Sequence, residues 1–326
     1  MFKWNKLGKV FDPTETKDRP WLKEFAQAPA TLIFDDFVRV YFSCRPPRNE
    51  SGQYVSYTGY LDLNRNNLFD IINIAKQPIM PLGKPGTFDE FGTYPASVIN
   101  YNNELIAYYG GWTRCESVPF NVAIGMAKSK DNGVTFDKMG DGPVLSYTVG
   151  EPFVLSGPKI RRFNDRWYLW YIAGKKWLVT EGGQSQFYKA EPVYRIRMAV
   201  SNDGINWERV GRDIIEPKLE ENEAQASPDV IFHNGKYHMF YCYRHSQDYR
   251  ENSRGYRIGY AWSDNIVDWH RDDSKAGIDV SKEGWDSESI AYPHVFKLDG
   301  KVYMLYLGNQ VGRFGFGVAE LEGDLA

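Results

Sequence analysis

Three ionisable side chains occupy the same place in a repeated sequence unit, directly after a proline. They are Lys159, Asp229 and His294, while two further copies of the unit carry Ala30 and Ala96 there. An ammonium, a carboxylate and an imidazole that lie together can exchange protons and can hold an anion or a hydroxyl group. Because a buried unpaired charge costs several kcal/mol, such groups must pair with one another, with water or with a ligand. We therefore predict that the three side chains converge with Arg244 at the centre of a site, with Glu288 or Glu151 at its mouth.

The unit that must position them occurs five times. Each copy has a proline, an apolar strand, a polar two-residue turn and an aromatic-rich strand, and the prolines stand at 29, 95, 158, 228 and 293. The turns, such as Asn102-Asn103 and Asn234-Gly235, tolerate the left-handed backbone of tight hairpins. A third strand follows, and then a polar turn and an aromatic residue open a fourth. Four antiparallel strands in about 65 residues are typical of a propeller blade, so the sequence predicts an all-β, five-bladed β-propeller.

The blade boundaries follow from this repeat. We expect one domain over residues 1–326, with blades at approximately 28–75, 91–140, 154–211, 225–272 and 289–321. The fifth unit has no fourth strand of its own. The segment Trp4-Asn5-Lys6-Leu7-Gly8 matches Trp207-Glu208-Arg209-Val210-Gly211 in residue type. Residues 2–10 are therefore predicted to close the ring as the outer strand of the last blade.

The predicted pocket lies on one face of the ring, where the innermost strands begin and long loops join the second strands to the third. Long loops on a rigid scaffold commonly carry binding residues, and we expect them at Cys44–Ser56, Gly110–Asn121, Gly174–Tyr194, Arg244–Gly255 and Gly308–Arg313. Arg45, Arg244 and His245 end second strands there. An Arg fork suits a carboxylate or phosphate, although each arginine could equally be an exposed loop residue. Lys159 could also hold an anionic group.

Aromatic side chains at this face are candidate sugar platforms. They are Tyr94, Trp112 and Tyr292. Each ring could equally pack between blades, since aromatic residues make up 16% of the chain and most must be core.

The chain resembles the five-bladed glycosidase-type propellers of glycoside hydrolase families 43, 32, 68, 117 and 130. The resemblance rests on the five prolines, the Ser-x-Asp-Gly-x-x-Trp hairpin and the segment Glu288–Val295, which is similar to glycosidase-like proteins of bacterial surface-polysaccharide gene sets. It covers the whole chain and implies a carbohydrate-active function. Family 43 members place carboxylates one or two residues before these prolines. Here none of those positions is acidic, so the usual catalytic residues are not carried over.

Other carboxylates remain as catalytic candidates, because glycoside hydrolysis usually needs two. Asp229 begins an innermost strand, where the alternative is a carboxylate that binds backbone amides between blades. Glu151 and Glu288 precede their prolines by seven and five residues, and the alternative for each is a solvated loop charge. His294 could act as an acid or bind a sugar hydroxyl, or be a satisfied core histidine.

Three functions stay open from the sequence. The first is a glycoside hydrolase or transglycosylase-like enzyme that acts on a glycan or sugar nucleotide in the central pocket. The second is a non-catalytic carbohydrate-binding propeller of surface-polysaccharide metabolism, and the third is a scaffold for protein partners. The sugar, the linkage and the stereochemical outcome are not specified by the sequence.

Composition excludes other classes. The net charge of −3 gives no basic excess for nucleic acid, and no run of 18 apolar residues predicts a membrane span. No regular His or Cys spacing indicates a metal, and no Gly-rich phosphate loop indicates a cofactor. The first residues show no apolar signal region. Cys44, Cys115 and Cys242 are too few and odd in number for a disulfide framework, so we expect free thiols and a cytoplasmic location.

Overall fold

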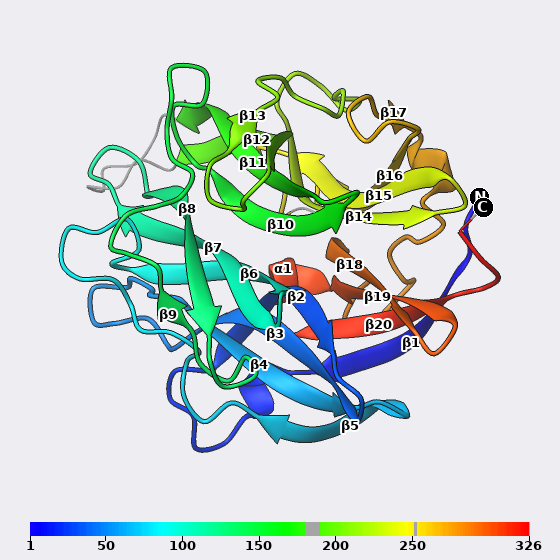
Figure 1. Ribbon diagram of the computed structural model, residues 1–326, viewed down its shortest axis with the longest axis horizontal. Coiled ribbons are helices and arrows are strands. Elements are labelled where there is room, and N and C mark those ends of the chain that lie inside the picture. The colour runs from blue at the N-terminus through cyan, green and yellow to red at the C-terminus, as the bar shows by residue number, and fades with distance from the viewer. Residues whose placement is uncertain (180–189, 251–252, 326) are drawn as a thin grey trace.

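The computed structural model describes residues 1–179, 190–250 and 253–325, and its strands form five four-stranded antiparallel sheets. The sheets are arranged around a common centre, where the first strand of each faces the others (Figure 1). This is the five-bladed β-propeller that the repeat predicts. The expectation that the prolines begin the innermost strands is wrong: each proline is the third to sixth residue of its strand and lies at a shift in the strand pairing. A bulge, like a strand start, tolerates the missing N–H group.

In the first four blades the strands run in chain order from the innermost to the outermost. Blade one contains β2 (Glu24–Ile33), β3 (Phe37–Arg45), β4 (Tyr57–Asn64) and β5 (Asn67–Ile74). Blade two contains β6 (Gly92–Tyr101), β7 (Glu104–Arg114), β8 (Phe120–Ser129) and β9 (Asp137–Lys138). Blade three contains β10 (Ser156–Phe163), β11 (Arg166–Val179), β12 (Ala190–Ser201) and β13 (Glu208–Arg209). Blade four contains β14 (Glu223–His233), β15 (Lys236–His245), β16 (Arg257–Ser263) and β17 (His270–Arg271).

The last blade joins the two ends of the chain, as predicted. It contains β18 (Ala291–Leu298), β19 (Lys301–Leu307), β20 (Phe316–Leu321) and β1 (Trp4–Phe11), and β1 pairs with β20 as its outer strand. Trp4 is buried and its indole N–H donates to the carbonyl of Ala276 at 3.1 Å. Phe2 packs on Phe240 and Tyr260 of blade four. The first residues therefore connect two blades as well as closing the ring.

Four of the five predicted hairpin turns have the expected left-handed backbone. Asn102 and Asn103 have φ of 52° and 62°, and Asn234 and Gly235 have φ of 47° and 77°. The pairs at 164–165 and 299–300 do the same. The first blade differs, because its turn residues Asp35 and Asp36 do not have positive φ, although the Phe34 N–H still donates to the Phe37 carbonyl at 2.9 Å. These turns lie together at one end of the axis, which we call the turn face, and the opposite end is the loop face.

One predicted loop is wrong in its described part. β11 runs to Val179 and β12 begins at Ala190, so most of the described residues of Gly174–Tyr194 form an antiparallel arm rather than a loop. Residues 180–189 of that loop lie outside the described residues, as do residues 251–252 of the loop predicted at Arg244–Gly255. The remaining helical turns are short: η1 (Pro13–Glu15), η2 (Asp273–Lys275) and α1 (Asn309–Gly312).

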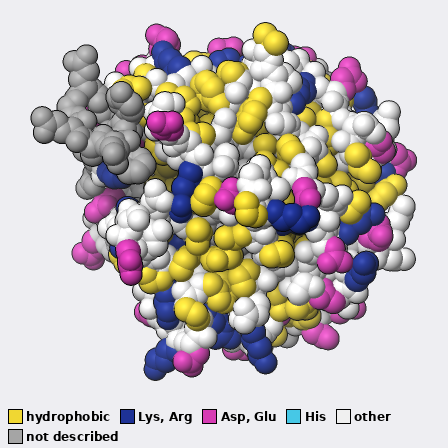
Figure 2. Space-filling view, turned by 90° about the vertical axis from the view of Figure 1, so that its left-hand side faces the viewer, with side chains coloured by type: hydrophobic (Ala, Val, Ile, Leu, Met, Phe, Trp, Pro, Cys, Tyr) yellow, Lys and Arg dark blue, Asp and Glu magenta, His cyan; other side chains and the backbone are white. Residues whose placement is uncertain are grey.

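The core lies between the blades and consists mainly of aromatic and branched side chains. Trp167, Trp170, Tyr41, Tyr108 and Phe42 are among the largest fully buried side chains. On the surface, Figure 2 shows hydrophobic side chains over the middle of one face, interspersed with charged side chains of both signs. Within the described residues, no helix is long and apolar enough to cross a membrane.

Candidate functional site

The candidate site residues lie in two layers along the propeller axis. The first layer, the axial charge cluster, consists of Lys159, Arg161, Asp229 and His294. The second layer lies at the loop face and consists of two arginines and four tyrosines. We call it the tyrosine–arginine cluster, and its members are Arg45, Tyr94, Tyr194, Arg244, Tyr256 and Tyr292.

A bulge at the start of each innermost strand sets the direction of these side chains. The pairing of the first and second strands shifts next to the proline in all five blades. In three blades the non-glycine residue before the proline is left-handed: Ala28, Ser227 and Tyr292 have φ of 51°, 50° and 52°. Bulges re-aim side chains, and left-handed backbone at such residues costs about 1–3 kcal/mol each. The fold therefore holds Tyr292 in a strained position at the loop face.

The axial charge cluster is centred on the carboxylate of Asp229. His294 Nδ1 lies 2.6 Å from Asp229 Oδ2, and Lys159 Nζ lies 3.9 Å from the same oxygen. Arg161 pairs with the other oxygen through Nη2. The backbone N–H of Val295 also donates to Asp229, at 2.9 Å. The predicted convergence is present for Lys159, Asp229 and His294, and all three side chains are buried. Arg244 does not join them, because its guanidinium contacts Tyr194 and Tyr249 in the other layer.

Hydrogen bonding fixes the tautomer of His294. The backbone N–H of Thr31 donates to its Nε2 at 2.9 Å, so Nδ1 carries the proton and donates to Asp229. Burial lowers the pKa of His294 to about 4, against the opposing pull of Asp229, and lowers the pKa of Lys159 to about 8. Burial raises the pKa of Asp229, but the charges of Arg161, His294 and Lys159 outweigh it and hold the pKa well below its usual range. Asp229 is therefore ionised and His294 neutral at pH 7.

These bonds form ties between neighbouring blades. An innermost strand has a free edge, and its N–H groups need acceptors. Ser97 of blade two accepts a hydrogen bond from the Ile160 N–H of blade three at 3.2 Å. Asp229 of blade four accepts from the Val295 N–H of blade five, and His294 of blade five accepts from the Thr31 N–H of blade one. The catalytic role predicted for Asp229 stays a prediction, and these contacts favour the alternative of a carboxylate that binds backbone amides.

A cavity of about 370 Å³ opens beside this layer toward the turn face. His294 and Arg161 line it together with apolar side chains such as Leu32, Ile231 and Phe296. The polar atoms of His294 and Arg161 are already bonded to Asp229, Thr31 and backbone carbonyls. The cavity therefore offers few free hydrogen-bonding groups.

The tyrosine–arginine cluster receives at least one side chain from every blade. Its hydroxyl groups form short contacts, with 3.0 Å between Tyr94 and Tyr292 and 2.6 Å between Tyr194 and Tyr256. Arg244 Nη2 donates to the Tyr194 hydroxyl at 3.2 Å. Burial raises the pKa of Tyr94 to about 12 and raises those of Tyr256 and Tyr292 well above 10. These three hydroxyls therefore stay protonated and can donate hydrogen bonds.

The two arginines of this cluster have no carboxylate partner. None of the ion pairs of the described residues includes Arg45 or Arg244, and the Nε of each is buried without a hydrogen bond. Arg244 is 3% exposed and lies 3.8 Å from the ring centre of Tyr249. Arg45 is half-buried, and its guanidinium lies over the ring of Phe25, 4.6 Å from the ring centre. It also interacts electrostatically with Tyr94 and Tyr292. The cluster is thus a positively charged, aromatic site that solvent reaches at Arg45.

Strained backbone also borders the cluster on the side of α1. Gln27 donates to the Val311 carbonyl at 2.8 Å and accepts from Arg45 Nη2 at 3.5 Å. Gln310 and Val311 have φ of 54° and 56°, so α1 is a left-handed turn rather than a regular helix. In Figure 1 it lies near the centre of the ring, next to β2. For a branched residue such as Val311 this conformation is an outlier, and such strain is concentrated at ligand sites.

Other predicted residues lie outside both layers. Glu151 is 1% exposed, accepts from the Tyr171 hydroxyl at 2.8 Å and pairs with Arg197 and Arg209. His245 pairs with Glu220 at 2.6 Å. These contacts favour structural roles, while the predicted functional roles remain untested.

Two further predicted residues lie at the loop face. Trp112 donates to Ser56 Oγ at 2.6 Å and packs on Phe91. Glu288 precedes β18, is half-buried, and its carboxylate takes part in no hydrogen bond or ion pair reported for the described residues. Among the three predicted catalytic carboxylates, Glu288 is therefore the one whose oxygens are available to contact a ligand.

Sequence reasoning missed three members of the two layers. Arg161 stands two residues after Lys159 on the same strand, so strand alternation could have placed it on the same face. Tyr194 and Tyr256 come from the third strand of blade three and the segment before the third strand of blade four. No proline marks those positions, so the repeat gave no signal for them.

Comparison with known proteins agrees with the architecture. No family model matches the sequence. The uncharacterized protein Rv1502 of Mycobacterium tuberculosis (strain ATCC 25618 / H37Rv) is 33% identical over 320 residues, covering 98% of this chain and 99% of that protein. The 1,2-β-oligomannan phosphorylase of Thermoanaerobacter sp. (strain X514) is 30% identical over 204 residues, covering 61% of this chain and 58% of the phosphorylase.

Solved structures share the fold at low sequence identity. A glycosyl hydrolase from Bacteroides ovatus superposes with a TM-score of 0.71 at 14% identity, covering 98% of this chain and 93% of that chain. A structure from the GH130 family superposes with a TM-score of 0.70 at 15% identity, covering 98% of this chain and 94% of that chain. That family is described as mannoside phosphorylases that include glycoside hydrolases of β-1,2-mannosidic linkages in Candida mannan.

Proposed function

The chain belongs to the same family as the uncharacterized Mycobacterium tuberculosis protein Rv1502, and we propose that it is a carbohydrate-active protein whose tyrosine–arginine cluster binds a glycan together with an oxyanion. The oxyanion is phosphate, either free or carried by a sugar. The glycan is the ligand class that the glycoside hydrolase and phosphorylase relatives favour.

The observation that carries this proposal is a pair of arginines without carboxylate partners, of which Arg244 is buried and Arg45 half-buried. A guanidinium with a buried, unbonded N–H group is costly, and phosphate oxygens would satisfy the Nε groups of Arg45 and Arg244. The protonated hydroxyls of Tyr94 and Tyr292 can donate to the same oxyanion or to sugar oxygens. Their rings offer the flat apolar faces that a sugar ring packs against.

The reaction that fits these groups is phosphorolysis of a glycosidic bond. Hydrolysis needs two carboxyl groups, one to protonate the leaving oxygen and one to activate water or attack. Phosphate brings its own nucleophilic oxygen, so one proton donor is enough. A phosphate oxygen would bond to the anomeric carbon while the bond to the leaving oxygen breaks, and Glu288 would supply the proton to that oxygen. Glu24, also at this face, is a poorer donor, because its bonds to Tyr54 and Arg313 outweigh burial and lower its pKa.

One observation favours a second candidate, a non-catalytic sugar-binding propeller. Within the described residues, the tyrosine–arginine cluster contains no pair of carboxylates. If Glu288 does not donate a proton, the same site binds a phosphorylated sugar without turning it over.

Phosphate binding is the direct test. We expect inorganic phosphate, or a sugar phosphate in a parallel titration, to raise the melting temperature of the wild type. Arg244→Lys should weaken this effect by about tenfold or more, because it removes a fork that donates several hydrogen bonds. Lys236→Gln, on the turn face, is the matched control and should behave as the wild type. Stabilisation by neither phosphate nor any sugar phosphate would contradict the proposal.

Turnover separates the two candidates. Incubation with β-1,2-linked mannooligosaccharides should release mannose 1-phosphate only when phosphate is present, and Glu288→Gln should abolish release while phosphate still binds. Cleavage at the same rate without phosphate would instead identify a hydrolase. Binding without any cleavage would favour the non-catalytic candidate.

We also propose that the protein is located in the cytoplasm. Cys44, Cys115 and Cys242 are all free in the structure, which supports a reducing compartment. Thiol titration of the denatured, unreduced protein purified from its native host should count three thiols. A count of one would indicate a disulfide and an oxidising compartment.

A further inference from the structure

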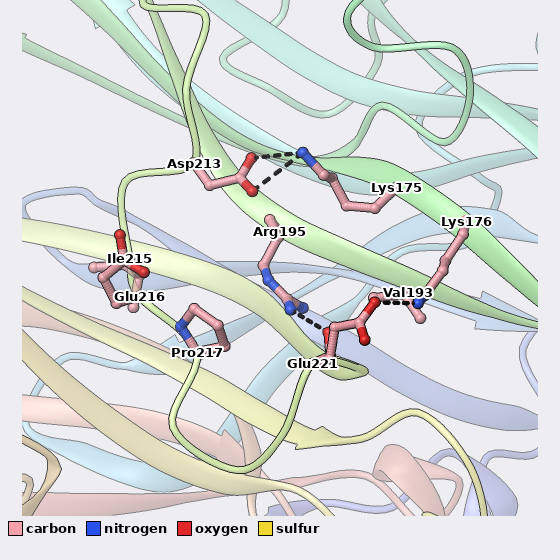
Figure 3. A pocket seen from close by; sticks show the side chains of 9 residues that line it. All are labelled: Lys175, Lys176, Val193, Arg195, Asp213, Ile215, Glu216, Pro217 and Glu221. Atoms are coloured by element: carbon pink, nitrogen blue, oxygen red, sulfur yellow. Dashed lines mark hydrogen bonds and ion pairs between the residues drawn. The ribbon is translucent and has the colours of Figure 1, made fainter.

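A second cavity, of about 290 Å³, lies between the arm of blade three and the segment that leads to blade four. Its charged lining consists of Lys175, Lys176, Arg195, Asp213, Glu216 and Glu221. Figure 3 shows these side chains arranged around the opening, with Lys175 paired to Asp213 on one side and Lys176 paired to Glu221 on the other. The cavity is separate from both axial layers, and the predictions from sequence did not include it.

Arg195 is the polar group that this cavity leaves unsatisfied. The side chain is 6% exposed, and its Nη2 donates to the Glu221 carbonyl at 2.7 Å. Its Nη1 is buried without a hydrogen-bond partner, and none of the ion pairs of the described residues includes Arg195. A hydrogen-bond acceptor from a ligand would relieve the cost of that unbonded N–H group.

The charges of the lining select the class of ligand. Three cations face three anions, so the lining as a whole is neutral, in contrast to the tyrosine–arginine cluster with its two unpaired arginines. A free anion would meet Asp213, Glu216 and Glu221, and a free cation would meet Arg195 and the two lysines. A neutral molecule with several hydroxyl groups can donate to the carboxylates and accept from the cations.

The size and the apolar part of the lining narrow the ligand further. Val193, Ile215 and Pro217 complete the walls and can contact the C–H groups of a ring. The volume lies at the lower limit of ligand pockets, which span about 300–1,000 Å³. One monosaccharide unit, with its hydroxyl rim and apolar ring faces, matches both properties.

The cavity adjoins the axial site. Tyr194 belongs to the tyrosine–arginine cluster, and its chain neighbours Val193 and Arg195 line the cavity. Glu221 lines the cavity, while the preceding residue Glu220 binds His245, which follows Arg244. The two sites thus share β12 and the segment before β14 as walls, with Val193 and Arg195 projecting from the opposite face of β12 to Tyr194.

From these observations we propose that the cavity is a peripheral subsite that binds one neutral sugar unit of a glycan whose anionic end occupies the axial site. The inference rests on the proposed function, because it assumes that the axial ligand is a glycan. It adds a second point of attachment, selective for uncharged sugar residues, beside the oxyanion site.

Methyl NMR of the full chain tests this inference. With ¹³C-labelled Ile and Val methyl groups, Ile215 reports on the cavity, Val311 on the axial site and Ile231 on the turn-face cavity. We expect at least one of mannose, glucose, galactose and N-acetylglucosamine to shift Ile215 saturably and leave Ile231 unchanged. Glu216→Gln, on an exposed side chain, should weaken that response, and Arg195→Lys should raise the dissociation constant about tenfold or more.

The outcomes separate this inference from the proposed function. No shift of Ile215 with any of the four sugars, or equal affinity in the wild type and both variants, would overturn the subsite. If Arg195→Lys does not fold, Glu216→Gln alone decides. Arg244→Lys should weaken the response of Val311 to phosphate by about tenfold or more but leave the sugar response of Ile215 intact. Loss of the phosphate response in the wild type would instead overturn the axial oxyanion site.

Discussion

The contacts of Asp229 support a structural role for this carboxylate rather than the catalytic role predicted from the sequence. Its position directly after the repeated proline suggested a catalytic carboxylate, yet it accepts from Arg161, from His294 and from the Val295 amide. An ionised carboxylate whose pKa is held this low is a poor proton donor at neutral pH. Such a group instead fixes the positive charges around it.

We predict that Asp229→Asn destabilises the protein by about 3–5 kcal/mol, the loss typical of a buried ion pair that loses one partner. Lys159 would be left buried, and Arg161 half-buried, without their anion. Urea unfolding measures the change, and Asp36→Asn, on an exposed turn, is the matched control. Normal stability with complete loss of turnover would show instead that Asp229 is catalytic.

The stability of the protein should also depend on pH through His294. Its pKa is about 4 in the folded state and about 6.5 when unfolded, so the unfolded state binds more protons between these values. The free energy of unfolding should therefore fall as the pH is lowered from about 6.5 to 4, by up to about 1.4 kcal/mol per pH unit. Urea unfolding at several pH values should show this slope, and His294→Gln should flatten it. An unchanged slope in the variant would assign the effect to other groups.

At the scale of elements, a carboxylate on the segment before the innermost strand ties that segment to the blade. Asp89, Glu151 and Asp286 are all buried, and each accepts from the hydroxyl of a second-strand tyrosine, Tyr109, Tyr171 and Tyr306 respectively. Each also pairs with a cation: Lys138, Arg197 with Arg209, and Lys6. The same geometry in three blades indicates a role in blade assembly.

We expect Glu151→Gln and Asp89→Asn to behave alike. Each removes the anion of a buried ion pair and should cost about 3–5 kcal/mol in the free energy of unfolding, while phosphate binding by the folded fraction persists. Differential scanning calorimetry with and without phosphate measures both properties. A Glu151→Gln variant with full stability and no turnover would restore the catalytic role predicted from sequence.

For the whole molecule, closure of the ring joins residues that are more than 300 positions apart in the chain. β1 supplies the outer strand of blade five, and Phe2 and Trp4 bury their rings against Phe240 of blade four. The amino-terminal strand thus links the last blade both to its own sheet and to its neighbour.

Deletion of residues 1–10 should therefore lower the free energy of unfolding by at least about 3 kcal/mol, the range for loss of one buried large aromatic side chain. Urea unfolding measures the loss, and a synthetic peptide of residues 1–11 added in trans should recover part of it. A truncated protein with an unchanged unfolding midpoint would refute the role of β1 in closure.

The sequence by itself determined the fold, because local signals repeat in every blade. The spacing of the prolines, the polar turn residues and the alternating strands depend only on neighbouring residues, and five copies make the pattern unambiguous. The position of each proline within its strand was not predicted correctly, because the residues before it also pair with the second strand. The matching segment around Trp4 even indicated how the ring closes. The same repeat placed Lys159, Asp229 and His294 at equivalent positions, so their convergence followed from symmetry.

Only the tertiary structure decided which groups are free to act. Whether a carboxylate is available depends on the cations and amides that other blades bring to it, as Arg161 and Val295 do for Asp229. Tyr194 and Tyr256 reach the axial site from strands without a sequence mark, and Arg195 faces a cavity formed between two blades. These contacts join residues far apart in the chain, and no local pattern records them.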